Sequence, residues 1–142
     1  MTEKRQQGSR REFLKNTGRA AAATTILSSA SHVHAAEDNS IRVVLIGCGG
    51  RGTGAAANAL SVNNGPTLIC LADVFENNLN ISYASLSGNE KFSSKVDIPE
   101  ENKFICFDAY KKSMVLLKPG EVVFLATPPA FSWVHYSYAI EK

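Results

Sequence analysis

Cysteine is scarce in this sequence of 142 residues, with only Cys48, Cys70 and Cys106. An odd number of cysteines at wide spacing is neither a disulfide framework nor a zinc-binding pattern. Each cysteine lies in or beside an apolar run, where a small buried residue is the ordinary interpretation. The length is enough for one domain with a modest core.

A basic excess is absent from most of the chain. Residues 1–35 carry six Lys or Arg and two acidic residues, whereas residues 36–142 carry nine basic and eleven acidic residues. The larger part is therefore slightly acidic, which argues against nucleic acid as its partner.

The N-terminal segment lacks an apolar run long enough to span a bilayer, which takes about 20 residues. A basic stretch precedes a short Ala/Thr-rich stretch at 20–30, in the order of an export signal. The letters SRREFLK match the twin-arginine export motif, with the paired arginines at Arg10 and Arg11. A basic amphipathic helix in a cytoplasmic protein is the alternative interpretation.

Small residues at Val33 and Ala35 form a suitable cleavage site, and no cysteine adjoins it, which argues against a lipoprotein. We therefore expect residues 1–35 to be a twin-arginine signal peptide that is cleaved after Ala35. The mature protein, starting at Ala36, is then exported, to the periplasm or otherwise out of the cytoplasm, and is not attached to a membrane.

Apolar runs alternate with helix-forming segments through residues 36–142, without an internal repeat. This alternation predicts a parallel α/β sheet covered on both faces, and right-handed crossovers favour the doubly wound Rossmann fold. We expect Asp108 to cap the third helix, and Trp133 and Tyr136 to pack on the sheet. The predicted strands span 41–46, 67–74, 103–107 and 121–126, the predicted helices span 53–60, 76–86, 108–117 and 132–142, and a polar loop spans 87–102.

A glycine-rich turn separates the first predicted strand from the first predicted helix. Gly47 permits the tight turn, Gly49 lets the backbone approach a pyrophosphate, and Gly52 lets the helix pack on the strand. The helix N-terminus then offers N–H groups to phosphate. The whole G-x-G-x-x-G motif reads Gly47, Cys48, Gly49, Gly50, Arg51 and Gly52, and a turn that binds nothing is the alternative.

An acidic residue, Asp73, ends the second predicted strand and is placed to accept hydrogen bonds from the adenosine ribose. The next five residues include no cation to meet a 2′-phosphate, so NAD is favoured over NADP. A S-adenosylmethionine fold usually has an acid two residues before the first glycine, where this chain has Leu45. Arg51 either reaches the pyrophosphate or lies in solvent, and for His135 packing is favoured over catalysis.

Four stretches, VVLIGCGGRG, LADVFENNL, FDAYKK and VVFLATPPAFSWVHYSYAIEK, together resemble the N-terminal domain of the glucose–fructose oxidoreductase/inositol dehydrogenase (Gfo/Idh/MocA) family. The resemblance covers residues 41–142. It implies NAD-dependent oxidoreductase chemistry on a sugar, polyol or related hydroxyl compound. It also implies that Thr127, Pro128 and Pro129 contact the nicotinamide side of the cofactor.

The family's Glu-Lys-Pro motif and its second, substrate-binding domain do not appear in this sequence. Lys142 belongs to a helix terminus and is not the catalytic lysine of that motif. We assign no catalytic and no metal-binding residue, because hydride transfer needs a group that moves the hydroxyl proton. The alternative function is therefore a non-catalytic, truncated product that binds dinucleotide weakly or not at all.

We expect residues 36–142 to be a dinucleotide-binding domain that is incomplete at its C-terminal side. In the doubly wound order the fourth strand lies beside the first, and its other edge has no partner strand in this sequence. An apolar edge of this kind invites pairing with another chain. A homo-oligomer joined through the fourth strand is therefore a further expectation.

Overall fold

The structure, a computed structural model, describes residues 40–142. The predicted signal peptide and its cleavage site lie outside the described residues. Strands and helices alternate along the described part of the chain. The strands are β1 (Arg42–Ile46), β2 (Thr67–Asp73), β3 (Lys103–Ile105) and β4 (Val122–Leu125), and the helices are α2 (Gly50–Leu60), α3 (Glu76–Ser87), α4 (Ala109–Met114) and α5 (Pro129–Glu141).

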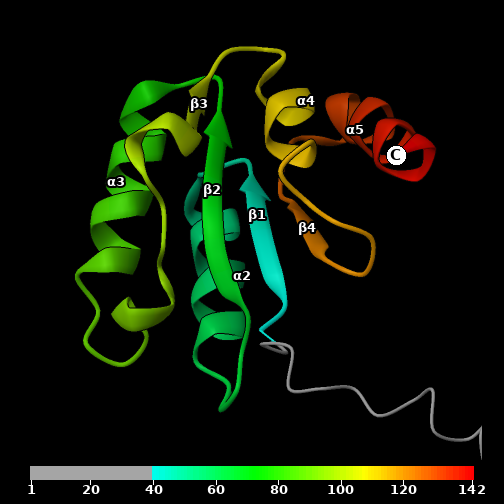
Figure 1. The fold of residues 1–142 in the computed structure, drawn as a ribbon. Helices are drawn as coiled ribbons and strands as arrows, with labels where there is room; N and C mark the ends of the chain where they lie inside the picture. Colours follow the sequence, from blue (N-terminus) through cyan, green and yellow to red (C-terminus); the bar gives the residue numbers. More distant parts are fainter. Residues whose placement is uncertain (1–39) are drawn as a thin grey trace, which may run out of the picture. The chain divides into compact units, whose positions relative to one another are not determined.

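The four strands form one parallel sheet in the order β3-β2-β1-β4 (Figure 1). The two middle strands are apolar throughout apart from their ends, as strands buried on both faces must be. The α/β fold with an all-parallel sheet is thereby confirmed. The strand order also places β1 in the middle of the sheet with β4 beside it, as predicted from the sequence.

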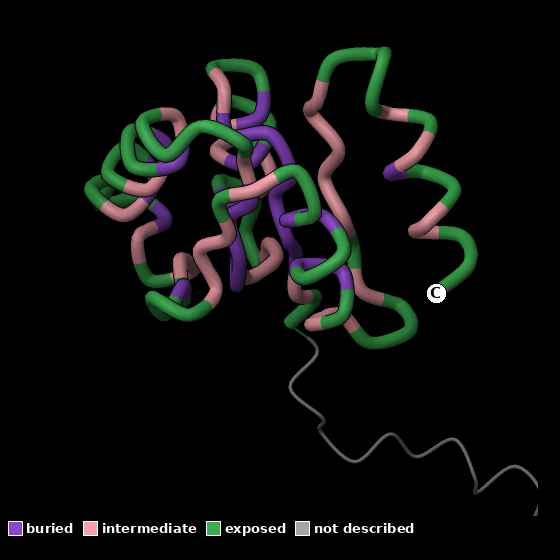
Figure 2. Tube along the Cα trace, turned by 90° about the horizontal axis from the view of Figure 1, so that it is seen from above, coloured by how far each residue is buried: buried purple, intermediate pink, exposed green. Residues whose placement is uncertain are grey.

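Side chains alternate along β1 and serve two separate cores. Val43 and Leu45 face one core, which α2 and α3 cover, whereas Val44 and Ile46 face the other side of the sheet. There α4 and α5 supply the covering side chains, so helices lie on both faces (Figure 1). Figure 2 shows that buried residues gather in the middle strands, whereas β4 and α5 are mainly half-buried or exposed.

Two helices begin earlier than the sequence suggested. α2 starts at Gly50 instead of Thr53, so the last three motif residues form its first turn. α5 starts at Pro129 instead of Ser132, and proline is well tolerated there because a first-turn N–H has no helical partner to lose. Both changes bring a helix N-terminus directly to the end of a strand.

The expectations for α5 and α4 side chains need correction. Trp133 and Tyr136 are 68% and 62% exposed and do not pack on the sheet. Val134 and Tyr138 do so instead, because they project from the side of α5 that faces α4. Asp108 is the N-cap residue of α4, as predicted, but its side chain makes no capping hydrogen bond and instead pairs with Lys111 at 2.9 Å.

The predicted polar loop is an ordered part of the fold. It contains two 3₁₀ turns, η2 (Ser93–Lys95) and η3 (Glu100–Asn102), and it buries Phe92 and Ile98 in the core under α2 and α3. Val96 forms a parallel bridge with Leu68, and the Asn102 side chain donates to the Ile69 carbonyl oxygen at 3.0 Å. Apolar residues spaced among polar ones concealed this packing in the sequence.

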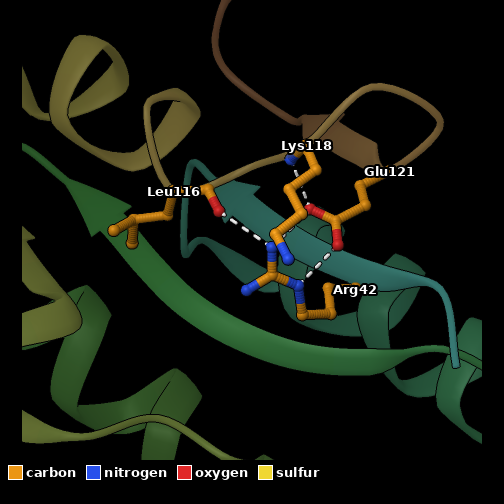
Figure 3. Close-up of polar contacts among 4 residues, drawn as sticks. All are labelled: Arg42, Leu116, Lys118 and Glu121. Atoms are coloured by element: carbon orange, nitrogen blue, oxygen red, sulfur yellow. Dashed lines mark hydrogen bonds and ion pairs between the residues drawn. The ribbon is translucent and has the colours of Figure 1, made fainter. Parts of the chain in front are cut away.

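An ion pair joins the start of β1 to the start of β4 (Figure 3). Arg42 donates to both carboxylate oxygens of Glu121 and also to the Leu116 carbonyl oxygen at 3.2 Å. The backbone N–H of Lys118 donates to the same carboxylate. The hydrogen bond from Arg42, and after it the N–H of Lys118, lowers the pKa of Glu121.

We expect Glu121→Gln to reduce the free energy of unfolding by about 1 kcal/mol at pH 7, because one charge-assisted contact of a half-buried pair is lost. A carboxylate with a lowered pKa stabilises the fold above its unfolded pKa of about 4.3, and that contribution disappears as the pH falls through the folded pKa. Urea unfolding at pH 7 and near pH 3 should therefore show the difference shrinking in acid. The exposed Glu101→Gln is the control and should change stability little at either pH.

Candidate functional site

A cavity of about 500 Å³ lies where the strands reach their C-terminal ends. Its walls come from the segments that follow β1, β2, β3 and β4, together with α4 and α5. The chain leaves the central β1 toward β2 on one side, while β4 lies on the other side. This reversal of strand order is where open parallel α/β sheets bind ligands.

The glycine-rich turn is fixed by close backbone approaches. Gly47 has φ +96°, and a Cβ built there would lie 2.8 Å from the Ala126 carbonyl carbon and oxygen. A Cβ on Gly52 would lie 1.9 Å from the Gly47 carbonyl oxygen. Only glycine therefore lets α2 pack against the end of β1, with β4 alongside.

Gly49 and Gly50 are glycines for a different reason. Apart from its neighbours along the chain, a Cβ on either would meet no atom within 4 Å, so the space in front of them is open. Gly49 is the N-cap of α2, and the first intrahelical bond runs from the Thr53 N–H to its carbonyl oxygen at 2.9 Å. The N–H groups of the first turn of α2, which come before Thr53, have no intrahelical acceptor, so they are available to an anion.

Asp73 connects the end of β2 to this turn. Its Oδ2 accepts a hydrogen bond from the Cys48 N–H at 2.6 Å, and its Oδ1 accepts one from the Phe75 N–H at 2.8 Å. Asp73 also lines the cavity. Each carboxylate oxygen already accepts one N–H and has a further lone pair that can accept another donor. Asp73 therefore positions the glycine turn and presents an acceptor to the cavity.

The remaining walls are mostly apolar and carry no cation. Phe75 and Phe107 stand largely exposed after β2 and β3, at the same end of the sheet as Asp73. No Lys or Arg is among the residues that line the cavity. The region around Asp73 thus suits a flat, uncharged ring and a hydroxyl-bearing sugar better than an additional phosphate.

On the β4 side, Thr127 and His135 lie at the same cavity wall. Thr127 Oγ1 is 3.1 Å from His135 Nδ1, and the His135 ring packs on Tyr110 with 4.3 Å between centroids. Burial lowers the pKa of His135. His135 is therefore neutral at pH 7.

The two buried thiols are poor nucleophiles. Burial raises the pKa of Cys48 to about 12, and also that of Cys70 to about 12. The Cys48 thiol donates to the Ala72 carbonyl oxygen at 3.6 Å, so it acts as a small packing group under the turn. Cys106 is half-buried and is the cysteine that reaches the cavity.

The cavity brings together half of the ten residues predicted as cofactor contacts. Arg51 is exposed and does not line the cavity, and its contact with a pyrophosphate stays a prediction. Cys48 and Gly52 lie beneath the turn, whereas Gly50 and Pro129 are exposed beside it. The five that line the cavity are Gly47, Gly49, Asp73, Thr127 and Pro128.

Several wall residues could not be identified from the sequence. For His135 the sequence favoured packing over catalysis, and the other wall residues belong to no motif. The one feature that could have indicated them is their position, either just after a strand or in the first turn of a helix. These residues are Phe75, Asn78, Cys106, Phe107, Tyr110 and Phe131.

No family model, curated protein or solved structure matches this chain. The resemblance to the Gfo/Idh/MocA family therefore stays a prediction. Within residues 40–142, no helix has both the length and the apolar character to cross a bilayer. The same residues hold no cluster of three or more potential metal-ligating side chains.

Proposed function

We propose that this domain binds NAD across the C-terminal ends of its strands. The observation that carries the proposal is the continuity of three features along one cavity. These features are the open N-terminus of α2 at Gly49, the acceptor Asp73 beside it, and a wall without cations. The cavity volume of about 500 Å³ lies in the range of small-molecule sites.

The residues present fit a dinucleotide. The empty space before Gly49 and Gly50 allows a pyrophosphate to approach the first N–H groups of α2. In this proposal Asp73 accepts hydrogen bonds from ribose hydroxyls on the β2 side, and Thr127 lines the cavity on the β4 side. A pyrophosphate in the middle and a nucleoside on either side is the arrangement that this geometry favours.

The preference for NAD rests on the charges near Asp73. A 2′-phosphate would meet this carboxylate, with Glu76 following closely and no Lys or Arg in the wall. Like charges without a compensating cation disfavour NADP.

We further propose that the domain is the cofactor-binding part of an oxidoreductase acting on a sugar, polyol or related hydroxyl compound. This step is supported by the sequence resemblance alone. A bound nicotinamide would supply the hydride chemistry, and this chain's residues would hold and orient it. The alternative is a non-catalytic domain with weak or no dinucleotide binding, and the titration of the chain with NAD described next tests it.

Calorimetric titration of the full chain is expected to give tighter binding of NAD than of NADP, by about tenfold or more. Asp73→Ala should weaken NAD by about tenfold to 100-fold, the loss of hydrogen bonds to a charged group, and weaken NADP less. Because Asp73 also holds the turn, the ratio of the two dissociation constants is the informative quantity. Tighter binding of NADP by the unaltered chain would contradict this role of Asp73, and binding of neither would contradict the proposed function.

A further inference from the structure

His135 is the one histidine within residues 40–142, and it is only 8% exposed at the β4 side of the cavity. It comes from α5 and reaches back toward the segment that follows β4. Its ring is held between the Thr127 hydroxyl and the Tyr110 ring, so its orientation is fixed.

Four contacts fix this corner of the cavity. His135 Nδ1 is 3.1 Å from Thr127 Oγ1, and Tyr110 packs on the ring while Tyr138 meets Tyr110 edge-on at 5.5 Å. Ser132 Oγ donates to the Thr127 carbonyl oxygen at 3.1 Å and so holds the backbone of that residue. The Thr127 hydroxyl is therefore anchored through both its backbone and its side chain.

The hydroxyl keeps a free hydrogen-bonding position after it bonds to His135. A threonine hydroxyl offers one donor and two acceptor sites, and the contact with Nδ1 uses one of these. Pro128 and Phe131 make the adjoining wall apolar. A polar ligand group buried here needs a fixed partner, because an unpaired one is costly.

The sheet order decides which part of a dinucleotide would lie here. Asp73 follows β2, and Thr127 follows β4, on opposite sides of the central β1. With the adenosine ribose at Asp73 and the pyrophosphate at α2, the second nucleoside extends toward Thr127. Its carboxamide carries both a donor and an acceptor that require partners.

We propose that His135 is a positioning residue that holds the Thr127 hydroxyl toward the nicotinamide carboxamide, so that the domain favours a dinucleotide bearing this amide. The inference rests on the proposed function. It adds a determinant of ligand choice at the end of the cavity away from Asp73.

The charge state of His135 bears on this role. The titratable groups that share its cavity are Asp73, Cys106 and Tyr110, and Lys111 lies near the outer side of Tyr110, with Nζ 5.6 Å from the ring centroid. Burial keeps the imidazole neutral at pH 7 by lowering its pKa. Protonation in mild acid would place a cation beside the positively charged ring of NAD, and would leave Nδ1 able only to donate.

The test compares NAD with ADP-ribose, which lacks the nicotinamide, on the full chain. We expect Thr127→Val and His135→Phe each to weaken NAD by about tenfold, the loss of one hydrogen bond, and to leave ADP-ribose within about twofold. The double variant should lose no more than either single variant, because both act on one contact. His135→Asn, whose amide oxygen offers an acceptor, should recover part of the loss.

Two measurements on the unaltered chain keep the test independent of how the variants fold. NMR signals of the His135 imidazole should shift with NAD and stay in place with ADP-ribose. NAD affinity should fall as the pH is lowered into the acidic range in which the imidazole takes up a proton, whereas ADP-ribose affinity should change less.

Equal losses for both ligands in the variants, or NMR shifts that are the same for both, would overturn the role of His135 and leave dinucleotide binding standing. ADP-ribose binding as tight as NAD binding would mean that the nicotinamide adds no affinity, and would also overturn the role of His135. If neither ligand binds the unaltered chain, the proposed function fails and the role of His135 fails with it.

Discussion

The Gly49→Val variant is expected to lose NAD binding by about 100-fold or more while the domain stays folded. Position 49 has an extended backbone, with φ −69° and ψ 178°, that valine can adopt, and apart from the neighbouring residues no atom lies within 4 Å of a Cβ built there. The added side chain would instead occupy the space that a pyrophosphate needs next to the N–H groups of α2. Losing two charge-assisted hydrogen bonds accounts for a change of this size.

Gly52→Ala, three residues further on, should destabilise the fold itself instead of blocking the ligand. Its Cβ would lie 1.9 Å from the Gly47 carbonyl oxygen, so α2 has to move away from the end of β1. We expect a loss of about 3 kcal/mol or more in the free energy of unfolding, which is at the severe end for a single added methyl group. Thermal melting followed by circular dichroism separates this loss of fold from a loss of binding.

Gly54→Val is the matched control for Gly49→Val. Position 54 is exposed on the same helix, and a Cβ there also meets nothing within 4 Å. It should therefore keep both its melting temperature and its NAD affinity. NAD binding that survives Gly49→Val unchanged, or that Gly54→Val reduces equally, would show that the pyrophosphate does not lie at this helix N-terminus.

The contrast between these glycines also shows what could be predicted from sequence. The spacing of Gly47, Gly49 and Gly52 after an apolar run identified the turn, because each glycine answers a distinct steric demand. The start of α2 at Gly50 was not predictable in the same way, since glycine has low helix propensity and tertiary packing overrides it. The parallel sheet followed more simply from apolar runs buried on both faces.

The β4 side of the cavity was less accessible to sequence reasoning. Thr127 and His135 are eight residues apart, and their contact depends on α5 beginning at Pro129, directly after the turn. Asp73 was predicted as a ribose acceptor, but its two backbone donors, on Cys48 and Phe75, arise from how the turn folds back on β2. Contacts between segments that meet only in three dimensions leave little trace in the order of residues.

β4 and β3 are the two edge strands of the sheet, and they differ in whether they carry charged residues. Along β4, the Ala126 N–H bonds to the Ile46 carbonyl oxygen of β1, so the alternate residues Val123 and Leu125 turn their backbone groups outward. β4 reads VVFL without a charge, whereas β3 at the other edge begins with Lys103, paired with Glu100 at 2.7 Å. Uncharged apolar edges favour strand pairing, and charged short ones oppose it.

The neighbouring helix α5 adds exposed apolar side chains. Trp133, Tyr136 and Ile140 are each about two-thirds exposed, at the spacing of one helical stripe. Aromatic side chains present about 150–250 Å² each. This stripe and the strand edge together would bury on the order of 1,000 Å² in a symmetric pair, which is below the usual 1,600 Å² of a stable complex. The expected occupant is a second copy of this chain, bound weakly and reversibly.

We therefore expect the full chain to dimerise with a dissociation constant of about 10–100 µM, visible as a concentration-dependent mass in analytical ultracentrifugation. Val122→Lys should weaken dimerisation by about tenfold or more, because Val122 is 39% exposed at the start of β4 and lysine there opposes edge pairing. Val62→Lys makes the same change at an exposed turn after α2 and should leave the dimer intact. A chain that stays monomeric at about 1 mM would mean that β4 is stable with β1 as its one partner strand in the sheet. Equal effects of both lysine variants would mean that β4 is not the dimer contact.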